Sequence, residues 1–411
     1  TDGSLDLTDN YTAAKSHTTD EPISLSEVTV DSGNVIDQVN KLFTRAAGAD
    51  ANTVITGTLT DSGGTILTAA GSKEISTGAN DVITVHIGTD IDPDGPKLTQ
   101  LKKLVDQAGV TRVNGSMTIS AADIATLVTN FDSSSKIAKN YIAFTLDDAV
   151  TAKQASDLVD LTNGTITFGA AGINDSIGNL ANVSGTAISA NLSNALGSGG
   201  DPTVDITVSD AELNTAAHVK ALNEIKAAQH ADNQLTASLT LDASEAAQFS
   251  GIANKNLTIT VSDAMSVSAF GTLDAVSSNN VTLSVGLSDS LGNLAPSGSV
   301  DAKVTAAIAQ DALSTLNVVV TPAVTANHAH LNTLAAAVPG TVTASVTGTA
   351  TELAALTSLG SSDPVTYTIS TNATAEQLKN IAGNTSLLNG SAAATFSSGK
   401  GVSDTLANIM K

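Results

Sequence analysis

A four-part pattern that occurs three times in succession restricts most strongly how this chain can fold. Each part is a short segment with alternating apolar and hydroxyl residues, followed by a stretch of small residues that favours a helix. Each copy closes with a related nine-residue segment, here called the signature, at residues 172–180, 286–294 and 401–409. The signatures lie 114 and 115 residues apart. This periodicity predicts a repeat architecture. The strands are expected to start at Ile83, Val113, Tyr141 and Thr165 in the first copy, Val204, Leu235, Leu257 and Val281 in the second, and Leu316, Val342, Val365 and Ala393 in the third.

The alternation inside each expected strand separates two faces. In Leu257-Thr258-Ile259-Thr260-Val261 the apolar side chains occupy every second position and threonine fills the others. Successive side chains of a strand point to opposite faces, so one face is aliphatic and the other is rich in hydroxyl groups. The segments after the strands carry capping boxes, in which a Thr is followed three residues later by Glu or Gln. These are Thr151 with Gln154, Thr349 with Glu352, and Thr374 with Gln377.

The spacing of the strands predicts how they connect. Neighbouring strands inside a copy start about two dozen residues apart, which leaves room for a strand, a helix of about ten residues and two short turns. Such units place strands in parallel. The expected fold is α/β, a strand–helix repeat solenoid with a parallel sheet whose helices cover the aliphatic face. Three tandem immunoglobulin-like β-sandwiches are the alternative that fits the copy length, but such domains contain almost no helix.

The chain divides into five segments by composition. We expect an N-terminal arm and helix at 1–50, with residues 1–33 irregular and an amphipathic helix over 34–45, and a degenerate capping repeat at 51–80. Three repeat cassettes then follow at 81–203, 204–315 and 316–411.

Composition excludes several classes of partner. The net charge is −22, with 18 basic and 40 acidic residues, which disfavours binding to nucleic acid or to an anionic membrane. No apolar run approaches the roughly 20 residues that span a bilayer, so we expect no membrane insertion. The chain has no cysteine and starts with Thr1 in place of Met. That start fits a mature secreted form or a fragment, and we infer export from it.

One segment resembles a metal-binding loop. Asp90, Asp92 and Asp94 are followed by Gly95, which matches the first half of a calcium loop. The twelfth position is Leu101, so the bidentate glutamate of an EF-hand is missing. The three aspartates are therefore candidate calcium ligands, and a plain turn ahead of a helix is the competing interpretation.

The signature aspartates Asp175, Asp289 and Asp404 occupy the same position in all three copies. Calcium binding or recognition between modules would explain the recurrence, and helix capping explains it more simply. His218 and His330 each lie fourteen residues after the first strand start of their copy, which indicates a shared structural environment. We find no catalytic motif, and the adjacent Asp147 and Asp148 are expected to lie in a solvated loop. We therefore expect no enzymatic activity.

The segments Gly348-Thr-Ala-Thr-Glu-Leu-Ala-Ala-Leu-Thr and Val402-Ser-Asp-Thr-Leu-Ala-Asn-Ile resemble repeat regions of large secreted prokaryotic surface proteins, of the S-layer, adhesin and cyanobacterial cell-surface kind. The resemblance covers roughly residues 81–411 and implies an extracellular structural role. The function expected from it is a self-assembling subunit of a surface layer or filament whose partners are copies of itself. The alternative is a monomeric adhesion module that binds a cell-surface glycan or protein through its Thr/Ser face.

Overall fold

This computed structural model describes residues 23–49, 54–61, 64–68, 74–91, 93, 96–131, 139–197, 200, 203–249, 255–277, 281–310, 315–360, 362–383, 394–405 and 408. The chain forms two compact units. Unit 1 comprises residues 1–183, 187–209 and 228–233, and unit 2 comprises residues 184–186, 210–227 and 234–411.

Unit 1 contains a six-stranded parallel sheet with the strand order β1-β2-β3-β4-β5-β6 and a separate parallel pair of β7 with β8. Each strand of the sheet lies beside the strand that precedes it in the sequence. The elements are β1 (Ile23–Val30), α2 (Gly33–Ala49), β2 (Ile55–Asp61), α3 (Thr65–Thr68), β3 (Val82–Ile87), α4 (Pro96–Asp106), β4 (Val110–Ile119), α5 (Ile124–Phe131), β5 (Asn140–Leu146), α7 (Ala152–Leu161), β6 (Ile166–Phe168), β7 (Ile173–Asp175), α8 (Ile177–Leu180), α9 (Ala190–Leu196) and β8 (Ile206–Val208).

Unit 2 follows the same plan. Strand β10 pairs in parallel with β9 and β11, and a five-stranded parallel sheet has the order β12-β13-β14-β15-β16. The elements are α10 (Ala216–Ala228), β9 (Leu235–Leu241), α11 (Ala243–Ala246), β10 (Lys255–Val261), α12 (Val267–Ser277), β11 (Val281–Leu283), β12 (Leu287–Asp289), α13 (Leu291–Leu294), the 3-10 helix η2 (Pro296–Gly298), α14 (Ala302–Gln310), β13 (Val318–Val324), α15 (His328–Ala337), β14 (Val342–Gly348), α16 (Ala350–Ala354), β15 (Val365–Ile369), α17 (Ala375–Gly383) and β16 (Ala394–Phe396).

These strand pairs confirm the expected α/β class. Every pair of neighbouring strands within a unit is parallel, and most consecutive strands are joined through a helix. The immunoglobulin-like alternative is wrong, because those sandwiches are built from antiparallel strands. A continuous solenoid through the whole chain stays a prediction.

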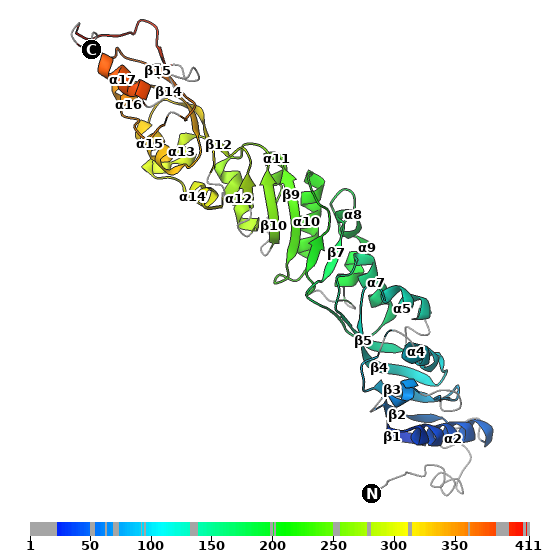
Figure 1. Cartoon of the computed structure of the whole chain (residues 1–411). Helices are drawn as coiled ribbons and strands as arrows, with labels where there is room; N and C mark the ends of the chain where they lie inside the picture. Colours follow the sequence, from blue (N-terminus) through cyan, green and yellow to red (C-terminus); the bar gives the residue numbers. More distant parts are fainter. Residues whose placement is uncertain are drawn as a thin grey trace. The chain divides into compact units, whose positions relative to one another are not determined.

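Each strand has one buried face and one open face, as the alternation predicts. Leu257, Ile259 and Val261 of β10 are buried, whereas the threonines between them are accessible. Helices α2, α4, α5 and α7 lie on the same side of strands β1–β5 (Figure 1). On the open face, hydroxyl residues of neighbouring strands are in register. We call three such sets the threonine rows: Thr118, Thr145 and Thr167; Thr240, Thr260 and Thr282; and Thr347, Thr368 and Thr395.

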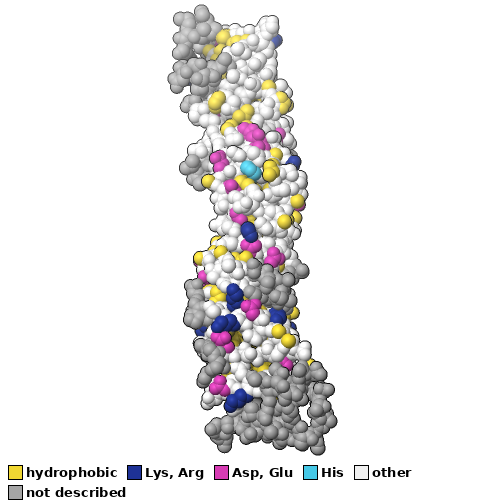
Figure 2. All heavy atoms as spheres, turned by 90° about the vertical axis from the view of Figure 1, so that its right-hand side faces the viewer, with side chains coloured by type: hydrophobic (Ala, Val, Ile, Leu, Met, Phe, Trp, Pro, Cys, Tyr) yellow, Lys and Arg dark blue, Asp and Glu magenta, His cyan; other side chains and the backbone are white. Residues whose placement is uncertain are grey.

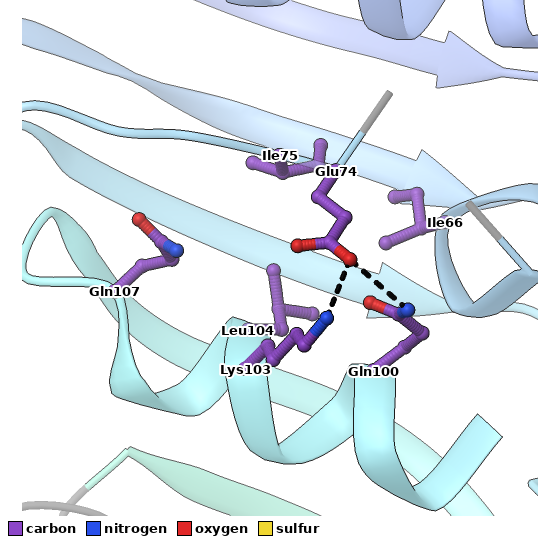
Figure 3. A pocket seen from close by; sticks show the side chains of 7 residues that line it. All are labelled: Ile66, Glu74, Ile75, Gln100, Lys103, Leu104 and Gln107. Atoms are coloured by element: carbon purple, nitrogen blue, oxygen red, sulfur yellow. Dashed lines mark hydrogen bonds and ion pairs between the residues drawn. The ribbon is translucent and has the colours of Figure 1, made fainter. Parts of the chain in front are cut away.

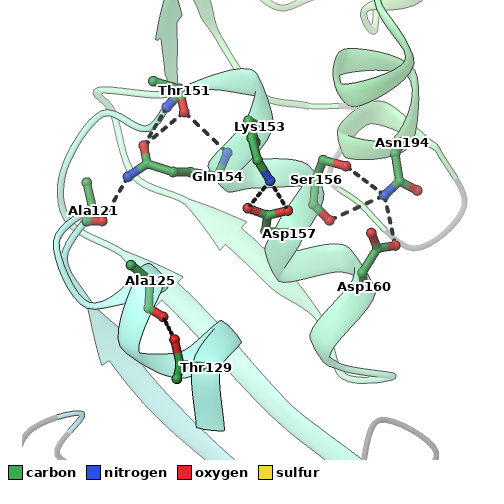
Figure 4. Close-up of polar contacts among 10 residues, drawn as sticks. All are labelled: Ala121, Ala125, Thr129, Thr151, Lys153, Gln154, Ser156, Asp157, Asp160 and Asn194. Carbon is green, nitrogen blue, oxygen red and sulfur yellow. Dashed lines mark hydrogen bonds and ion pairs between the residues drawn. The ribbon is translucent and has the colours of Figure 1, made fainter. Parts of the chain in front are cut away.

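The helix starts follow the capping boxes in the sequence. At α7 the Gln154 N–H donates to Thr151 Oγ1 at 3.2 Å, and the Thr151 N–H donates to Gln154 Oε1 at 2.9 Å (Figure 4). The same reciprocal bonds occur for the other two predicted boxes and for Asp242 with Glu245, which the analysis of the sequence did not single out. Gln154 also donates to the Ala121 carbonyl at 2.9 Å, so the cap ties α7 to the preceding part of the chain.

The N-terminal region contains more sheet than expected. Residues 23–30 form β1, although the sequence pattern predicts that residues 1–33 are irregular. The error arises because Glu27 and several Ser and Thr residues mask the apolar alternation, and a β-bulge shifts the register between Leu25 and Val28. The predicted helix over 34–45 is confirmed as α2. Within the described residues, no helix is both long and apolar enough to cross a lipid bilayer.

Tyr367 of β15 is buried, and its hydroxyl has no hydrogen-bond partner among the described residues. Burial raises the pKa of this phenol well above its ordinary value. An unsatisfied buried hydroxyl costs about 1–3 kcal/mol. We therefore expect Tyr367→Phe to raise the unfolding midpoint in thermal denaturation, with a gain in stability of about 1 kcal/mol. A lower midpoint would show that the hydroxyl is satisfied.

Candidate functional site

Each signature lies where one run of paired strands ends and the next run begins. In unit 1, β6 pairs with β5, the chain turns at Gly169–Gly172, and β7 then pairs with β8. In unit 2, β11 pairs with β10 and β12 pairs with β13. We call β7, β12 and the matching residues Val402–Asp404 the signature strands.

The inner edge of each signature strand is held in the same way. One residue in the preceding layer makes two backbone hydrogen bonds to the signature. Its N–H donates to the carbonyl of the signature glycine, and its own carbonyl accepts from the N–H of the third signature residue. A layer here means one strand with the helix that follows it; at a signature, the strand before it (β6, β11 or β16) and the signature strand count as one layer. The preceding residues are Val150, Met265 and Ala373, each at 3.1 Å from the glycine carbonyl.

Each signature aspartate accepts the same three hydrogen bonds. One carboxylate oxygen accepts from the next backbone N–H and from the amide of the Asn four residues later, and the other accepts from the first N–H of the helix in the preceding layer. The donors are Ser176 (2.8 Å), Asn179 (2.7 Å) and Ala152 (3.0 Å) for Asp175; Ser290 (2.7 Å), Asn293 (2.8 Å) and Val267 (3.1 Å) for Asp289; and Thr405 (2.7 Å), Asn408 (2.9 Å) and Ala375 (2.9 Å) for Asp404.

This geometry supports the capping interpretation but changes which helix is capped. Ser176 and Ser290 are the N-caps of the signature helices themselves, and the aspartates serve the helix one layer earlier. Helix N-terminal N–H groups need such acceptors because they have no partner inside the helix. The Asn408 amide and the Ala375 N–H hold the pKa of Asp404 below its ordinary value, so the carboxylate stays ionised in mild acid.

The first residue of each signature is a glycine for a steric reason. A Cβ at Gly172 would lie 2.1 Å from the Asp205 carbonyl oxygen, and one at Gly286 would lie 2.0 Å from that of Asn317. Both glycines also have positive φ, at 56° and 106°. Asp205 and Asn317 directly precede β8 and β13. The glycines therefore let the next strand approach closely.

The outer edge of the third signature strand differs from the other two. Ile173 and Leu287 are fully buried, and their N–H groups donate to the Asp205 carbonyl at 2.9 Å and the Asn317 carbonyl at 3.0 Å. Val402 is 53% exposed, and no described residue accepts a hydrogen bond from its N–H. A Cβ at Gly401 would meet nothing within 4 Å. The third site thus has the inner contacts of the others, and among the described residues no strand lies at its outer edge.

The sequence shows that the signature recurs, but it does not show which contacts the signature makes. The recurring Asp and Asn of the signature predict capping, and its first residue is a glycine in all three copies. A recurring glycine ahead of an apolar residue indicates close backbone approach. Only the strand pairing shows which backbone approaches it.

The predicted calcium ligands lie mostly outside the described residues. Asp90 is exposed, and Asp92 and Asp94 lie outside the described residues. Among the residues that the structure describes, no group of three acidic, His or Cys side chains could hold a metal ion. The calcium site stays a prediction.

His218 and His330 both occupy the third position of a helix, α10 and α15, which accounts for their recurrence. The Nδ1 atom of His218 accepts from the Asn214 N–H at 3.1 Å, so this ring caps its own helix. His328 is buried, with its Nε2 atom 3.0 Å from the Thr347 carbonyl oxygen. Asp147 and Asp148 are exposed in the turn after β5, as expected.

The remaining surface features are local. Tyr141 of β5 lies half-buried on the open face, where the Arg112 guanidinium stacks 3.8 Å from the centre of its ring. A small pocket beside α4 is lined by Glu74, which accepts from Lys103 at 2.6 Å and from Gln100 at 3.3 Å (Figure 3). In the view of Figure 2, hydrophobic side chains on the described surface are scattered among uncharged polar groups. These features do not form a reactive centre.

Comparisons of the chain with protein-family profiles, with curated proteins and with solved structures find no match.

The aspartate caps predict a stability effect. Asp175→Ala would leave three N–H groups, including the buried start of α7, without their acceptor. We expect a loss of about 1–3 kcal/mol in urea unfolding. Asp147→Ala, in an exposed turn, serves as the matched control and should change the unfolding midpoint little. Equal unfolding midpoints for the two variants would contradict the capping role.

Proposed function

We propose that this protein is a non-enzymatic extracellular structural protein whose copies assemble into a cell-surface layer or filament. The observation that carries the proposal is the stacked build of both units, in which parallel strands lie beside their neighbours in the sequence. An exposed strand edge presents unpaired backbone groups and is a template for pairing with another chain.

The build of the protein supports this role. Layers contact mainly their neighbours in the sequence, so assembly can extend the same contacts without a new kind of interface. The acidic composition and the lack of cysteine and tryptophan fit the resemblance to secreted surface proteins. The open face is polar, which keeps the lateral surface of an assembled subunit in water.

The threonine rows favour a second candidate function. Three accessible hydroxyl residues in register on parallel strands occur once in each copy of the repeat, on the open face. Such a surface offers regularly spaced donors and acceptors to a glycan or protein. A monomeric adhesion module would use it, and would show saturable binding without polymers.

Electron microscopy of the purified protein separates the two functions. We expect sheets or filaments that grow with protein concentration. Particles that remain single at every concentration, with a monomer mass in analytical ultracentrifugation, would contradict assembly and favour the adhesion module.

Calcium dependence tests the Asp90 segment. If the three aspartates bind Ca²⁺, then isothermal titration should detect one site, and the combined Asp90→Asn, Asp92→Asn and Asp94→Asn variant should lose it while keeping its circular dichroism spectrum. The control variant Asp147→Asn and Asp148→Asn removes two exposed carboxylates elsewhere and should bind as the original chain does. Equal binding by all three proteins would exclude the segment as the site.

A further inference from the structure

The open face of strands β3, β4 and β5 carries a group of four polar and aromatic side chains. We call it the Arg112 cluster, and its members are His86, Arg112, Asn114 and Tyr141. His86 lies opposite Asn114, and Asn114 lies opposite Tyr141. Three of the four side chains therefore form one row across three neighbouring strands, on the face that the helices leave open.

A β-bulge places Arg112 on this face. Val110 of β4 pairs with Ile83 of β3. Arg112, two residues further on, pairs with Thr84, so Thr111 is an extra residue in β4. Strict alternation from the buried Val110 would turn Arg112 toward the core, whereas the extra residue leaves it exposed. Bulges re-aim side chains in this way and are over-represented beside functional sites.

Two contacts hold the Arg112 guanidinium and leave its outer end available. Its Cζ atom lies 3.8 Å from the centre of the Tyr141 ring, and its Nε donates to Asn114 Oδ1 at 2.7 Å. Within the part of the chain that the structure describes, nothing accepts from the terminal nitrogens Nη1 and Nη2, and no carboxylate pairs with Arg112. The chain has 40 acidic residues and a net charge of −22. An exposed guanidinium that none of the described carboxylates pairs with is placed to receive one from another molecule.

The repeat itself does not require these side chains. The second copy was matched with the first through the register of its strands. In that match Thr236 and Asn256 take the places of Asn114 and Tyr141, and Gln234 corresponds to the arginine. The same sheet is therefore built in the second copy without a stacked arginine and tyrosine.

We propose that the Arg112 cluster binds the carboxylate of an acidic glycan, with a uronic acid unit seated on it. The Nη1 and Nη2 groups of Arg112 donate to the two carboxylate oxygens as a planar fork. Asn114 and His86 follow in the row with amide and imidazole groups, which suit sugar hydroxyls. Thr60 and Thr29 extend the same row in register on β2 and β1. This inference rests on the glycan-binding candidate function and names its ligand, and it does not depend on self-assembly.

The position of the cluster in the sheet favours a glycan over an acidic peptide. A peptide that binds a sheet commonly adds a strand at an edge, through backbone hydrogen bonds. Strands β3, β4 and β5 each have a paired strand on both sides, so the cluster has no backbone edge to offer. Recognition at this place depends on side-chain groups in a row, which is the complement of a chain of sugar hydroxyls.

Isothermal titration of the full chain with a short oligogalacturonide tests the site. We expect saturable binding, and none of the fully methyl-esterified oligomer, which has the same sugars without free carboxylates. Arg112→Gln should weaken binding about tenfold or more, because it removes the charge-assisted hydrogen bonds. Lys153→Gln is the matched control, because it removes one exposed positive charge from α7 and should bind as the original chain does.

Two further variants separate the charge of the cluster from its geometry. Arg112→Lys keeps the charge but lacks the planar fork, so it should also weaken binding. Tyr141→Leu keeps the arginine and removes the ring that holds it, so it should weaken binding less than Arg112→Gln does. Unchanged circular dichroism spectra would show that each variant retains its fold. Full binding by Arg112→Lys and Tyr141→Leu would contradict the fork geometry.

The other outcomes overturn the inference in distinguishable ways. Equal weakening by Arg112→Gln and Lys153→Gln would show general charge attraction, and equal binding of the methyl ester would show that no carboxylate is recognised. A polyglutamate peptide that binds as tightly as the oligogalacturonide would identify an acidic-peptide site. Absence of oligogalacturonide binding would exclude the cluster as its site. Binding that Arg112→Gln leaves unchanged would refute the cluster while the glycan-binding candidate function stands.

Discussion

The structure depends on side chains that cap a helix in the preceding layer. The first N–H of a helix has no partner in that helix, and where such a donor is buried and left unpaired it costs as much as a lost hydrogen bond. The acceptor comes from the following layer at five helices: Asp175 for α7, Asp263 for α11, Asp289 for α12, Thr371 for α16 and Asp404 for α17. A layer is therefore completed only when the next one is in place.

The same dependence applies to the strands. A parallel strand inside the stack pairs on both sides, and its edge is protected only by its neighbours. Strands β7 and β12 show that the signature restarts the pairing after an interruption, with the glycine making room for the next backbone. Residues Gly401–Asp404 repeat this arrangement at the third signature, where no described strand pairs with the outer edge. Capping and strand pairing thus both depend on the layer that follows.

Much of the fold could be read from the sequence because its signals are local. Strict alternation in segments such as Leu257–Val261 determines which face is buried, and the Thr151 and Gln154 pair marks a helix start within four residues. Strand β1 escaped recognition because a bulge and Glu27 break its alternation. The role of Asp175 was half recognised: capping chemistry follows from the residue type, but the choice of the α7 helix depends on a contact 23 residues away. The steric reason for the signature glycine is visible only in the structure, where the carbonyl of the following strand lies against Gly172 and Gly286.

Amide hydrogen exchange at Ala152 tests the central claim most directly, because the acceptor of this N–H, Asp175, comes from the following layer. The N–H of Leu287 acts as an internal reference, since it is buried and bonded to the Asn317 carbonyl in the other unit. In the original chain both N–H groups should exchange slowly, and in Asp175→Ala the Ala152 N–H should exchange faster while Leu287 keeps its protection. An Ala152 N–H that is equally protected in both proteins would contradict the claim that each layer is completed by the next.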